Sequence, residues 1–161
     1  MIATADLIDA HGDAFESCET QFRDFGGRLD FHGVLRTVGC REDSGLIRQV
    51  LSEKVTGGVL VVDGAGSLRC ALFGDVMAEL AVANGWSGVI FNGAVRDVVA
   101  LRRLPLGVKA LGSNPRRPSR AGVGQIDAPV TLGGATFRSG GYLYADEDGV
   151  LVSASPLHQA S

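Results

Sequence analysis

The chain has 161 residues, of which 45% are hydrophobic and 20% charged, and its formal net charge is −3. This length indicates a single domain over residues 1–161, and the acidic balance argues against direct binding to nucleic acid, which needs a sustained basic surface. No stretch approaches the roughly 18 apolar residues of a membrane span, so we expect a protein without a membrane partner.

The first third of the chain alternates predicted helix and strand. Thr4 is expected to be the N-cap of a short helix that ends before Gly12. Residues 31–40 are rich in Val, Leu, Thr and Phe, which is typical of a strand. A helix over 45–54 follows, with Ser44 as its cap.

The middle of the chain predicts parallel strands joined by a helix. Residues 59–62 and 88–91 are continuous apolar runs, as expected of strands that are covered on both faces. Between them, apolar residues recur at helical spacing over 76–84 and stop at Gly85. A strand, helix and strand in this order form a right-handed crossover, so the two strands should be parallel.

The last part of the chain predicts shorter elements. A short helix is expected over 96–104, a strand over 107–111 and an irregular loop over 114–119. Glycine pairs then separate short strands and hairpins, which are expected near 126–132, 135–138, 141–145 and 149–153. The predicted fold class is α/β, with a central, mainly parallel sheet and short C-terminal strands.

Two loops at the carboxyl edge of the predicted sheet carry the candidate site. One ends at Asp75, just before the helix, and the other contains Arg96 and Asp97. Ligands of parallel sheets collect at this edge, where unpaired N–H groups of a helix start, here residues 75–77, add positive partial charge. Two carboxylates without His or Cys suit Mg²⁺ or Mn²⁺, and an arginine suits a substrate carboxylate.

Plainer interpretations of these residues stay open. Asp75 could simply cap its helix, and Arg96 with Asp97 could be a surface ion pair. The glycines near position 64 partly match a dinucleotide or methyl-donor fingerprint, but Arg69 stands where the third glycine belongs. We expect close backbone approaches at a crowded turn instead, and an approach to a small ligand at the site glycines, which are Gly64, Gly66, Gly74 and Gly93.

Other reactive residue types give weaker signals. The three cysteines form no C-x-x-C pair, so neither a disulfide framework nor a thiolate zinc site is indicated, and a reducing cytoplasm fits best. Cys70 is expected to be a small buried residue. The histidines are interpreted as structural or surface groups, and a set of arginines as a solvated or subunit-facing surface; these are His11, His32 and His158, and Arg102, Arg103, Arg116, Arg117 and Arg120.

Several motifs together resemble one known family. They are Gly74-Asp75-Val-Met-Ala-Glu-Leu-Ala, Gly93-Ala-Val-Arg96-Asp97, Val61-Val-Asp-Gly-Ala-Gly-Ser-Leu-Arg, Gly107-Val-Lys-Ala-Leu-Gly and Tyr144-Ala-Asp-Glu-Asp-Gly149. The chain resembles the family of the regulator of ribonuclease activity A and the 4-hydroxy-4-methyl-2-oxoglutarate aldolases. The resemblance covers nearly the whole sequence.

The resemblance implies a swivelling-type β/β/α layered fold assembled as a homotrimer, with sites in clefts between subunits. It implies that Asp97 holds the divalent cation and that Asp75 orients a water at that cation. It further implies that a pyruvyl carboxylate is bound by Arg96 and by the backbone of a short segment, namely Gly74, Asp75, Val76 and Met77.

Two functions follow from the resemblance. The first is a metal-dependent aldolase that cleaves 4-hydroxy-4-methyl-2-oxoglutarate to pyruvate and also decarboxylates oxaloacetate, because Asp75, Arg96 and Asp97 are all present. The alternative is a non-catalytic regulator that binds and inhibits an RNA-degrading endoribonuclease. One departure from the aldolase pattern is Ala100, where many aldolases of the family have an acidic residue.

Overall fold

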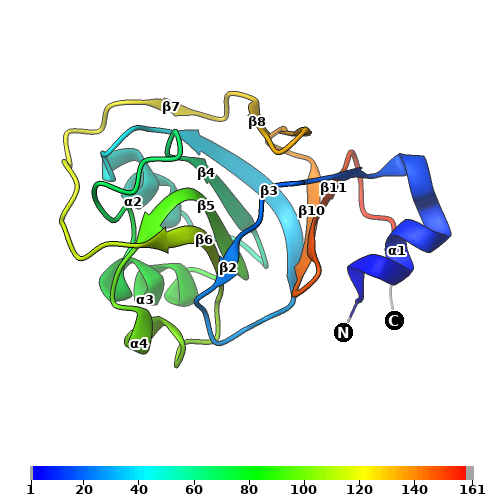
Figure 1. Cartoon of the computed structure of the whole chain (residues 1–161), viewed down its shortest axis with the longest axis horizontal. Coiled ribbons are helices and arrows are strands. Elements are labelled where there is room, and N and C mark those ends of the chain that lie inside the picture. Colours follow the sequence, from blue (N-terminus) through cyan, green and yellow to red (C-terminus); the bar gives the residue numbers. More distant parts are fainter. Residues whose placement is uncertain (1, 159–161) are drawn as a thin grey trace.

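Four parallel strands form the centre of the protein, whose computed structural model describes residues 2–158. In spatial order they are β3 (Phe31–Gly39), β4 (Val59–Asp63), β5 (Gly88–Val95) and β6 (Gly107–Ser113). Val61 pairs with Thr37 on one side and with Ile90 on the other. Figure 1 shows these strands side by side, and the predicted parallel centre of an α/β sheet is confirmed.

Antiparallel strands extend this sheet at both edges. Next to β3 lie β10 (Tyr142–Asp146), β11 (Gly149–Ser153) and the short β1 (Glu16–Ser17), while β2 (Arg23–Asp24) pairs with β6. The short C-terminal strands are therefore confirmed.

The stretch predicted as one strand near 126–132 is two strands. They are β7 (Gln125–Ile126), which pairs with β3, and β8 (Val130–Leu132), which forms a hairpin with β9 (Ala135–Phe137). The interruption follows from Asp127, whose φ of 65° lies in the left-handed region and breaks the extended backbone.

Three helices cover one face of the sheet: α2 (Gly45–Leu51), α3 (Asp75–Ala83) and α4 (Val98–Leu101). The predicted helix over 96–104 is thus much shorter, because β5 runs on to Val95 and only one turn forms after Asp97. Ser44 does precede α2, but its side chain makes no capping hydrogen bond; the Asp43 carboxylate accepts the N–H of Gly45 instead, at 2.9 Å.

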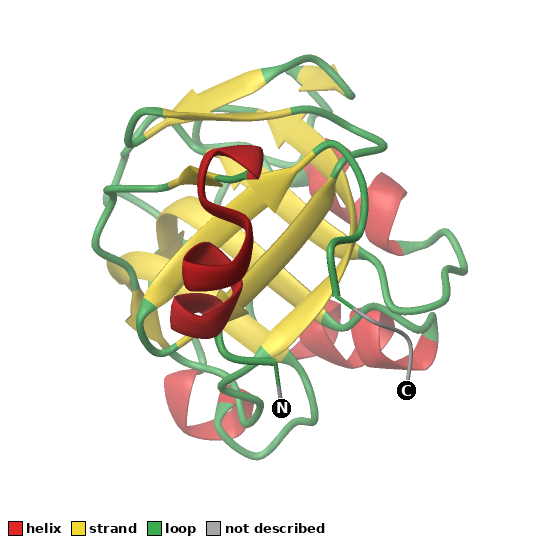
Figure 2. Cartoon of the chain, turned by 90° about the vertical axis from the view of Figure 1, so that its right-hand side faces the viewer, coloured by secondary structure: helices red, strands yellow, loops and turns green. Residues whose placement is uncertain are grey.

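The first helix, α1 (Thr4–His11), lies across the outer face of β10 and β11, and η1 (Gly12–Ala14) follows it (Figure 2). Contrary to the prediction, Thr4 is the first helical residue and Ala3 occupies the N-cap position. Thr4 instead donates to the Asp146 carboxylate, from its backbone N–H at 2.8 Å and from its hydroxyl at 2.7 Å. None of the helices that the structure describes has the length and apolar character needed to span a membrane.

Apolar residues of the central strands pack alternately into two cores. Leu60 and Val62 join the core under the helices, whereas Val59 and Val61 join the core against the C-terminal strands. All four are fully buried. Both faces of the parallel strands are therefore covered, as the continuous apolar runs predicted.

Part of the glycine content serves this packing. The ring of Phe31 lies over the starts of β5 and β6, where a Cβ at Gly88 or Gly107 would stand 2.2 or 2.1 Å from a ring carbon. No side chain fits at that distance, so only glycine lets the two strands pass beneath the ring.

Candidate functional site

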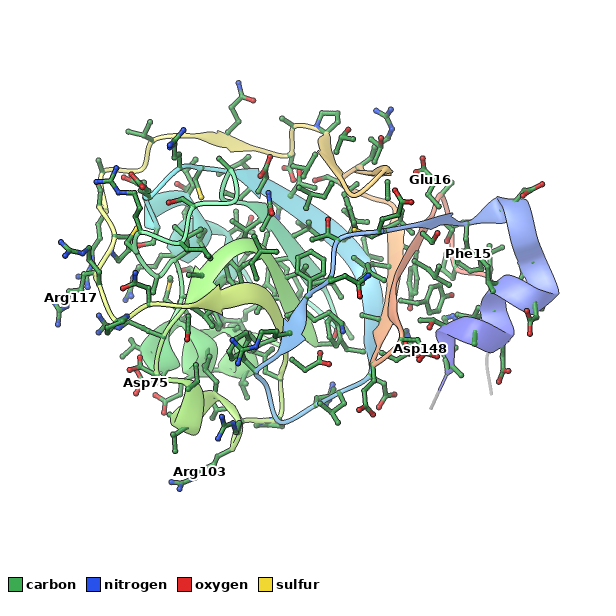
Figure 3. The ribbon with its side chains drawn as sticks, viewed as in Figure 1. Phe15, Glu16, Asp75, Arg103, Arg117 and Asp148 are labelled. Carbon is green, nitrogen blue, oxygen red and sulfur yellow. The ribbon has the colours of Figure 1, made fainter. Side chains whose placement is uncertain are left out.

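A cleft of about 530 Å³ lies at the carboxyl edge of the sheet, where the loops after β4 and β5 lead into α3 and α4. It also borders the start of α2 and the irregular segment that follows β6. The cleft is lined by Ser44, Gly45, Arg48, Ala71, Leu72, Phe73, Gly74, Asp75, Val76, Met77, Arg96, Asp97, Arg117, Pro118 and Arg120. In Figure 3, Asp75 and Arg117 lie at the end of the molecule opposite Phe15 and Glu16.

The cleft brings together the three side chains that the sequence singled out. The backbone N–H of Asp75 donates to Oδ2 of Asp97 at 3.0 Å, and the Nε of Arg96 lies 3.6 Å from the same oxygen. The side chains of Arg96 and Asp97 are 31% and 32% exposed, so both can reach a ligand from a partly desolvated position. Two loops separated by a whole helix therefore converge as expected.

Asp97 is held in an unusual backbone conformation. It is the residue before α4, and its φ of 59° is left-handed, which is uncommon for a residue other than glycine. Such conformations persist only where the surrounding structure fixes them, and they cluster at functional sites. Here the N–H of Asp75 holds Oδ2 of Asp97, and Gly74 permits the close approach, because a Cβ at that position would stand 2.4 Å from the same oxygen.

Arg96 is oriented by backbone contacts on both sides. Its N–H donates to the carbonyl of Phe73 at 2.9 Å, and its Nη1 donates to the carbonyl of Pro115 at 3.2 Å. Because a guanidinium has five N–H donors, these contacts leave others to point at a bound anion. The plainer interpretation of Arg96 and Asp97 as an ion pair is therefore true but insufficient, because the pair lines a cleft.

The start of α3 contributes backbone donors. Gly74, not Asp75, is the N-cap residue, and Asp75 is the first residue of the helix, which leaves its carboxylate uncommitted to a cap. The N–H of Asp75 is taken by Asp97, so it is not available as the sequence suggested. The N–H groups of Val76 and Met77 have no acceptor within the helix, and both residues line the cleft.

The glycines after β4 do not belong to this cleft. The carbonyl of Asn92 accepts from the N–H of Gly64 at 3.0 Å and of Gly66 at 3.1 Å. A Cβ at Gly64 would stand 2.7 Å from Leu72, and one at Gly93 would stand 3.2 Å from the same side chain. Gly64 and Gly93 therefore serve close packing, whereas Gly66 has a left-handed φ of 72° and open space around a Cβ, so it serves the turn. Of the four glycines expected to approach a ligand, Gly74 lines the cleft and the other three do not.

Sequence reasoning missed three arginines of the cleft. Arg48 comes from α2, while Arg117 and Arg120 come from the segment after β6 that was interpreted as a solvated or subunit-facing surface. The signal that could have found the last two is the pair of prolines, Pro115 and Pro118, which stiffens a segment without regular structure.

The remaining reactive residues lie elsewhere. All three cysteines are free, and Cys40 and Cys70 are buried, as expected for Cys70. His32 and His158 do meet, with ring centroids 4.9 Å apart, in a cluster with Tyr142 and Tyr144 of β10. That long-range contact could not be read from the sequence spacing. Among residues 2–158, no group of three or more His, Cys, Asp or Glu side chains could hold a metal ion.

The fold and the cleft define an α/β protein with a mixed-charge, arginine-rich cleft at the carboxyl edge of a parallel sheet. A family described as RraA-like: Aldolase/RraA matches residues 4–152. The chain therefore belongs to the RraA-like family, which includes both aldolases and ribonuclease inhibitors.

Solved structures agree with this membership. The RNA-processing inhibitor RraA from Thermus thermophilis is 41% identical, with a TM-score of 0.95, over 99% of this chain and 97% of that one. A protein from Geobacillus kaustophilus HTA426 described as S-adenosylmethionine: 2-dimethylmenaquinone methyltransferase is also 41% identical, with a TM-score of 0.95, over 97% of both chains. Streptomyces coelicolor RraAS2, at 24% identity, a TM-score of 0.78 and 95% and 81% coverage, shares the fold.

Proposed function

We propose that the protein is a divalent-metal-dependent aldolase that cleaves 4-hydroxy-4-methyl-2-oxoglutarate to pyruvate and also decarboxylates oxaloacetate. The observation that carries this proposal is the convergence of Asp75, Arg96 and Asp97 in one cleft. Membership of the RraA-like family supports it, because that family includes aldolases.

The donor set of the cleft fits Mg²⁺ or Mn²⁺. Asp97 and Asp75 offer hard carboxylate oxygens, and Mg²⁺ in proteins is commonly held by one or two carboxylates while it keeps several waters. Oδ2 of Asp97 is already engaged by the N–H of Asp75, so Oδ1 is the oxygen of Asp97 that would hold the cation. When bound, the cation would neutralise the negative charge that develops on the 2-oxo oxygen of the substrate.

The residues of the cleft would bind the substrate and transfer its proton. Arg96 and the N–H groups of Val76 and Met77 would bind the C1 carboxylate and orient the substrate. Asp75 would accept the proton of the C4 hydroxyl, directly or through a water, as the bond between C3 and C4 breaks. The electron pair of that bond goes to C3 and gives the enolate of pyruvate, which then takes a proton at C3; the C4 fragment leaves as a second pyruvate.

Oxaloacetate would use the same groups. Breaking its bond between C3 and C4 releases carbon dioxide and leaves the same enolate, so one site serves both reactions. No Schiff-base lysine is required, and Lys109 lies outside the cleft, where it is 2% exposed and bound to Asp24 at 2.9 Å.

Pyruvate release tests the proposal. The purified protein is assayed with oxaloacetate and with 4-hydroxy-4-methyl-2-oxoglutarate, with Mg²⁺, with Mn²⁺ and with a chelator, against the metal ion alone. We expect turnover above the metal background that disappears with the chelator and in Asp97→Ala. Turnover equal to the background for both substrates would refute the aldolase proposal.

A second candidate function is supported by the Thermus protein, whose name describes an RNA-processing inhibitor. We propose, as the alternative, that the chain binds an RNA-degrading endoribonuclease and lowers its activity. A pull-down with that ribonuclease at moderate salt, followed by an RNA cleavage assay, tests this function independently of pyruvate release. Absence of both a complex and inhibition rules it out.

We further propose that the protein assembles as a homotrimer and is located in the cytoplasm. Three free cysteines in residues 2–158 agree with a reducing compartment. Light scattering on the purified protein measures the assembly directly, and a mass other than three chains contradicts the first statement.

A further inference from the structure

We infer that Arg48, Arg117 and Arg120 form a distal anion subsite in the cleft, which determines specificity by holding a second anionic group of the ligand. The inference rests on the proposed function, in which Arg96 and the start of α3 hold the first carboxylate. It assigns the preference for a dianionic 2-oxo acid over a monoanionic one to three residues whose side chains form no ion pair within residues 2–158.

The charge of the cleft supports this subsite. The protein as a whole carries a formal charge of −3, yet the cleft is lined by four arginines and only two aspartates, which gives it a local excess of positive charge. One substrate carboxylate facing Arg96 would leave this excess at the distal end. Like charges that converge without a counter-charge repel one another, so a second anionic group would stabilise the cleft.

The three arginines are not used to hold the fold. Among the ion pairs of residues 2–158, none involves Arg48, Arg117 or Arg120. Arg36 shows the contrast, since it pairs with both Glu53 and Asp127 and thereby ties β3 to two other segments. These three arginines are exposed, so their guanidinium N–H groups can donate to a ligand.

The segment that carries Arg117 and Arg120 is held by several hydrogen bonds although it has no helix. The buried carboxylate of Asp43 accepts from the hydroxyl of Ser119 at 2.8 Å, from the N–H of Ala121 at 2.8 Å and from the N–H of Gly122 at 3.0 Å. The N–H of Ser44 also donates to the carbonyl of Ser119 at 2.9 Å.

The same segment connects the two ends of the cleft. The carbonyl of Arg116 accepts from the N–H of Ala71 at 2.8 Å, and the carbonyl of Pro115 accepts from Arg96. The backbone that carries Arg117 and Arg120 is therefore connected to the proximal Arg96 through Pro115. Because this backbone is already ordered, binding of a second anionic group has to order only the exposed arginine side chains.

The size of the cleft agrees with a ligand longer than pyruvate. Its volume of about 530 Å³ is in the range of pockets that enclose ligands of drug size. A three-carbon acid fills only part of this volume, which leaves room for the rest of a dicarboxylate.

Two unreactive ligands test the inference by calorimetry in the presence of Mg²⁺. Both 2-oxoglutarate and 2-oxobutyrate carry the same 2-oxo acid head, but only the first has a second carboxylate. The variants are Arg48→Gln, Arg117→Gln and Arg120→Gln, with Arg103→Gln as the matched control. Arg103 is exposed and outside the cleft, and its substitution changes the net charge by the same amount.

We expect wild type to bind 2-oxoglutarate at least about tenfold more tightly than 2-oxobutyrate. Arg117→Gln and Arg120→Gln should remove most of this difference and leave 2-oxobutyrate binding and the melting temperature unchanged, and Arg48→Gln should reduce it. Arg103→Gln should behave as wild type.

The failures are distinguishable. If 2-oxobutyrate binds but the dianion has no advantage, or if Arg103→Gln removes that advantage as fully as Arg117→Gln, the distal subsite is refuted while the proposed function stands. If neither ligand binds and no pyruvate is released from oxaloacetate, both are refuted. If binding of an acidic ribonuclease segment depends on Arg117 and Arg120 while binding of the small ligands does not, the subsite for small dianions is also refuted.

Discussion

The backbone N–H of Asp75 donates to the carboxylate of Asp97, 22 residues further along the chain, at 3.0 Å. This bond joins the start of α3 to the start of α4. It also engages Oδ2 of Asp97 and leaves Oδ1 for other partners. The start of α3, which is proposed to bind the substrate, therefore positions the carboxylate that is proposed to hold the cation.

Asp97→Asn should separate these two roles. The asparagine can still accept the N–H of Asp75, but it has no negative charge for a cation. We expect pyruvate release to fall by at least about 100-fold, because several kcal/mol of charge stabilisation are lost, with little change in melting temperature. Glu79→Gln, an exposed position of α3 outside the cleft, is the control. Full activity in Asp97→Asn would remove Asp97 from the proposed metal site.

Gly74→Ala tests the close approach to Asp97. The new Cβ would stand 2.4 Å from Oδ2, so the carboxylate or the start of α3 must shift. We expect a loss of activity together with a destabilisation of about 1–3 kcal/mol, as for other overpacked sites. Gly39→Ala serves as the control, because nothing lies within 4 Å of a Cβ there. Equal melting temperatures and activities for the two variants would contradict the packing argument.

Arg96→Lys keeps the charge and removes the planar fork. A lysine cannot donate two parallel hydrogen bonds to a carboxylate. We expect KM for oxaloacetate to rise about 10- to 100-fold, since a hydrogen bond to a charged group contributes about 1.5–3 kcal/mol. Steady-state kinetics measure this, with Arg102→Lys, an exposed residue outside the cleft, in parallel. An unchanged KM would mean that Arg96 does not bind the substrate.

Asp43→Ala should loosen the segment that carries Arg117 and Arg120. It leaves four donors without their acceptor, and we expect a loss of at least about 2 kcal/mol in the free energy of unfolding, measured with urea. Asp30→Ala, a charged position outside these contacts, is the control. Equal stability of the two variants would show that the Asp43 contacts contribute little.

The hydrogen bonds of the Asp43 carboxylate also predict how the free energy of unfolding depends on pH. Burial raises the pKa of Asp43, but the hydrogen bonds from Gly45, Ser119, Gly122 and Ala121 outweigh it and lower the pKa below the ordinary 3.8. A lowered folded-state pKa means that the stabilisation is complete above the unfolded value and is lost as pH falls through the folded value. The stability gap between wild type and Asp43→Ala should therefore be constant at neutral pH and shrink only below pH 3.8.

Cys40 should resist alkylation in the folded protein. Burial, together with the nearby carboxylates of Asp43 and Asp63, raises the pKa of its thiol to about 12. Because the thiolate is the reactive form, iodoacetamide at pH 8 should modify half-buried Cys18 first and Cys40 only after denaturation, as read by peptide mass spectrometry. Labelling of native Cys40 at the rate of Cys18 would contradict this.

The sequence predicts the parallel centre well, because continuous apolar runs such as 59–62 belong to strands that are buried on both sides. It also brings Asp75 to Arg96 and Asp97, since the carboxyl ends of neighbouring parallel strands meet. It fails at Arg117 and Arg120, whose approach to the cleft depends on hydrogen bonds to Asp43, 76 to 79 residues away. The spacing of neighbouring residues in the sequence does not predict such long-range contacts, and it does not predict the contact of His32 with His158 either.

The Asp43 contacts also bear on the order of events during synthesis. Residues 43–97 supply the proximal end of the cleft, but its distal wall stays open until Ser119, Ala121 and Gly122 have left the ribosome and closed loops of more than 70 residues onto Asp43. Contacts of such long range form late in folding. A nascent chain that ends before this segment would therefore lack the distal wall. Binding of a dianion by the cleft would then require that the contacts between this segment and Asp43 have formed.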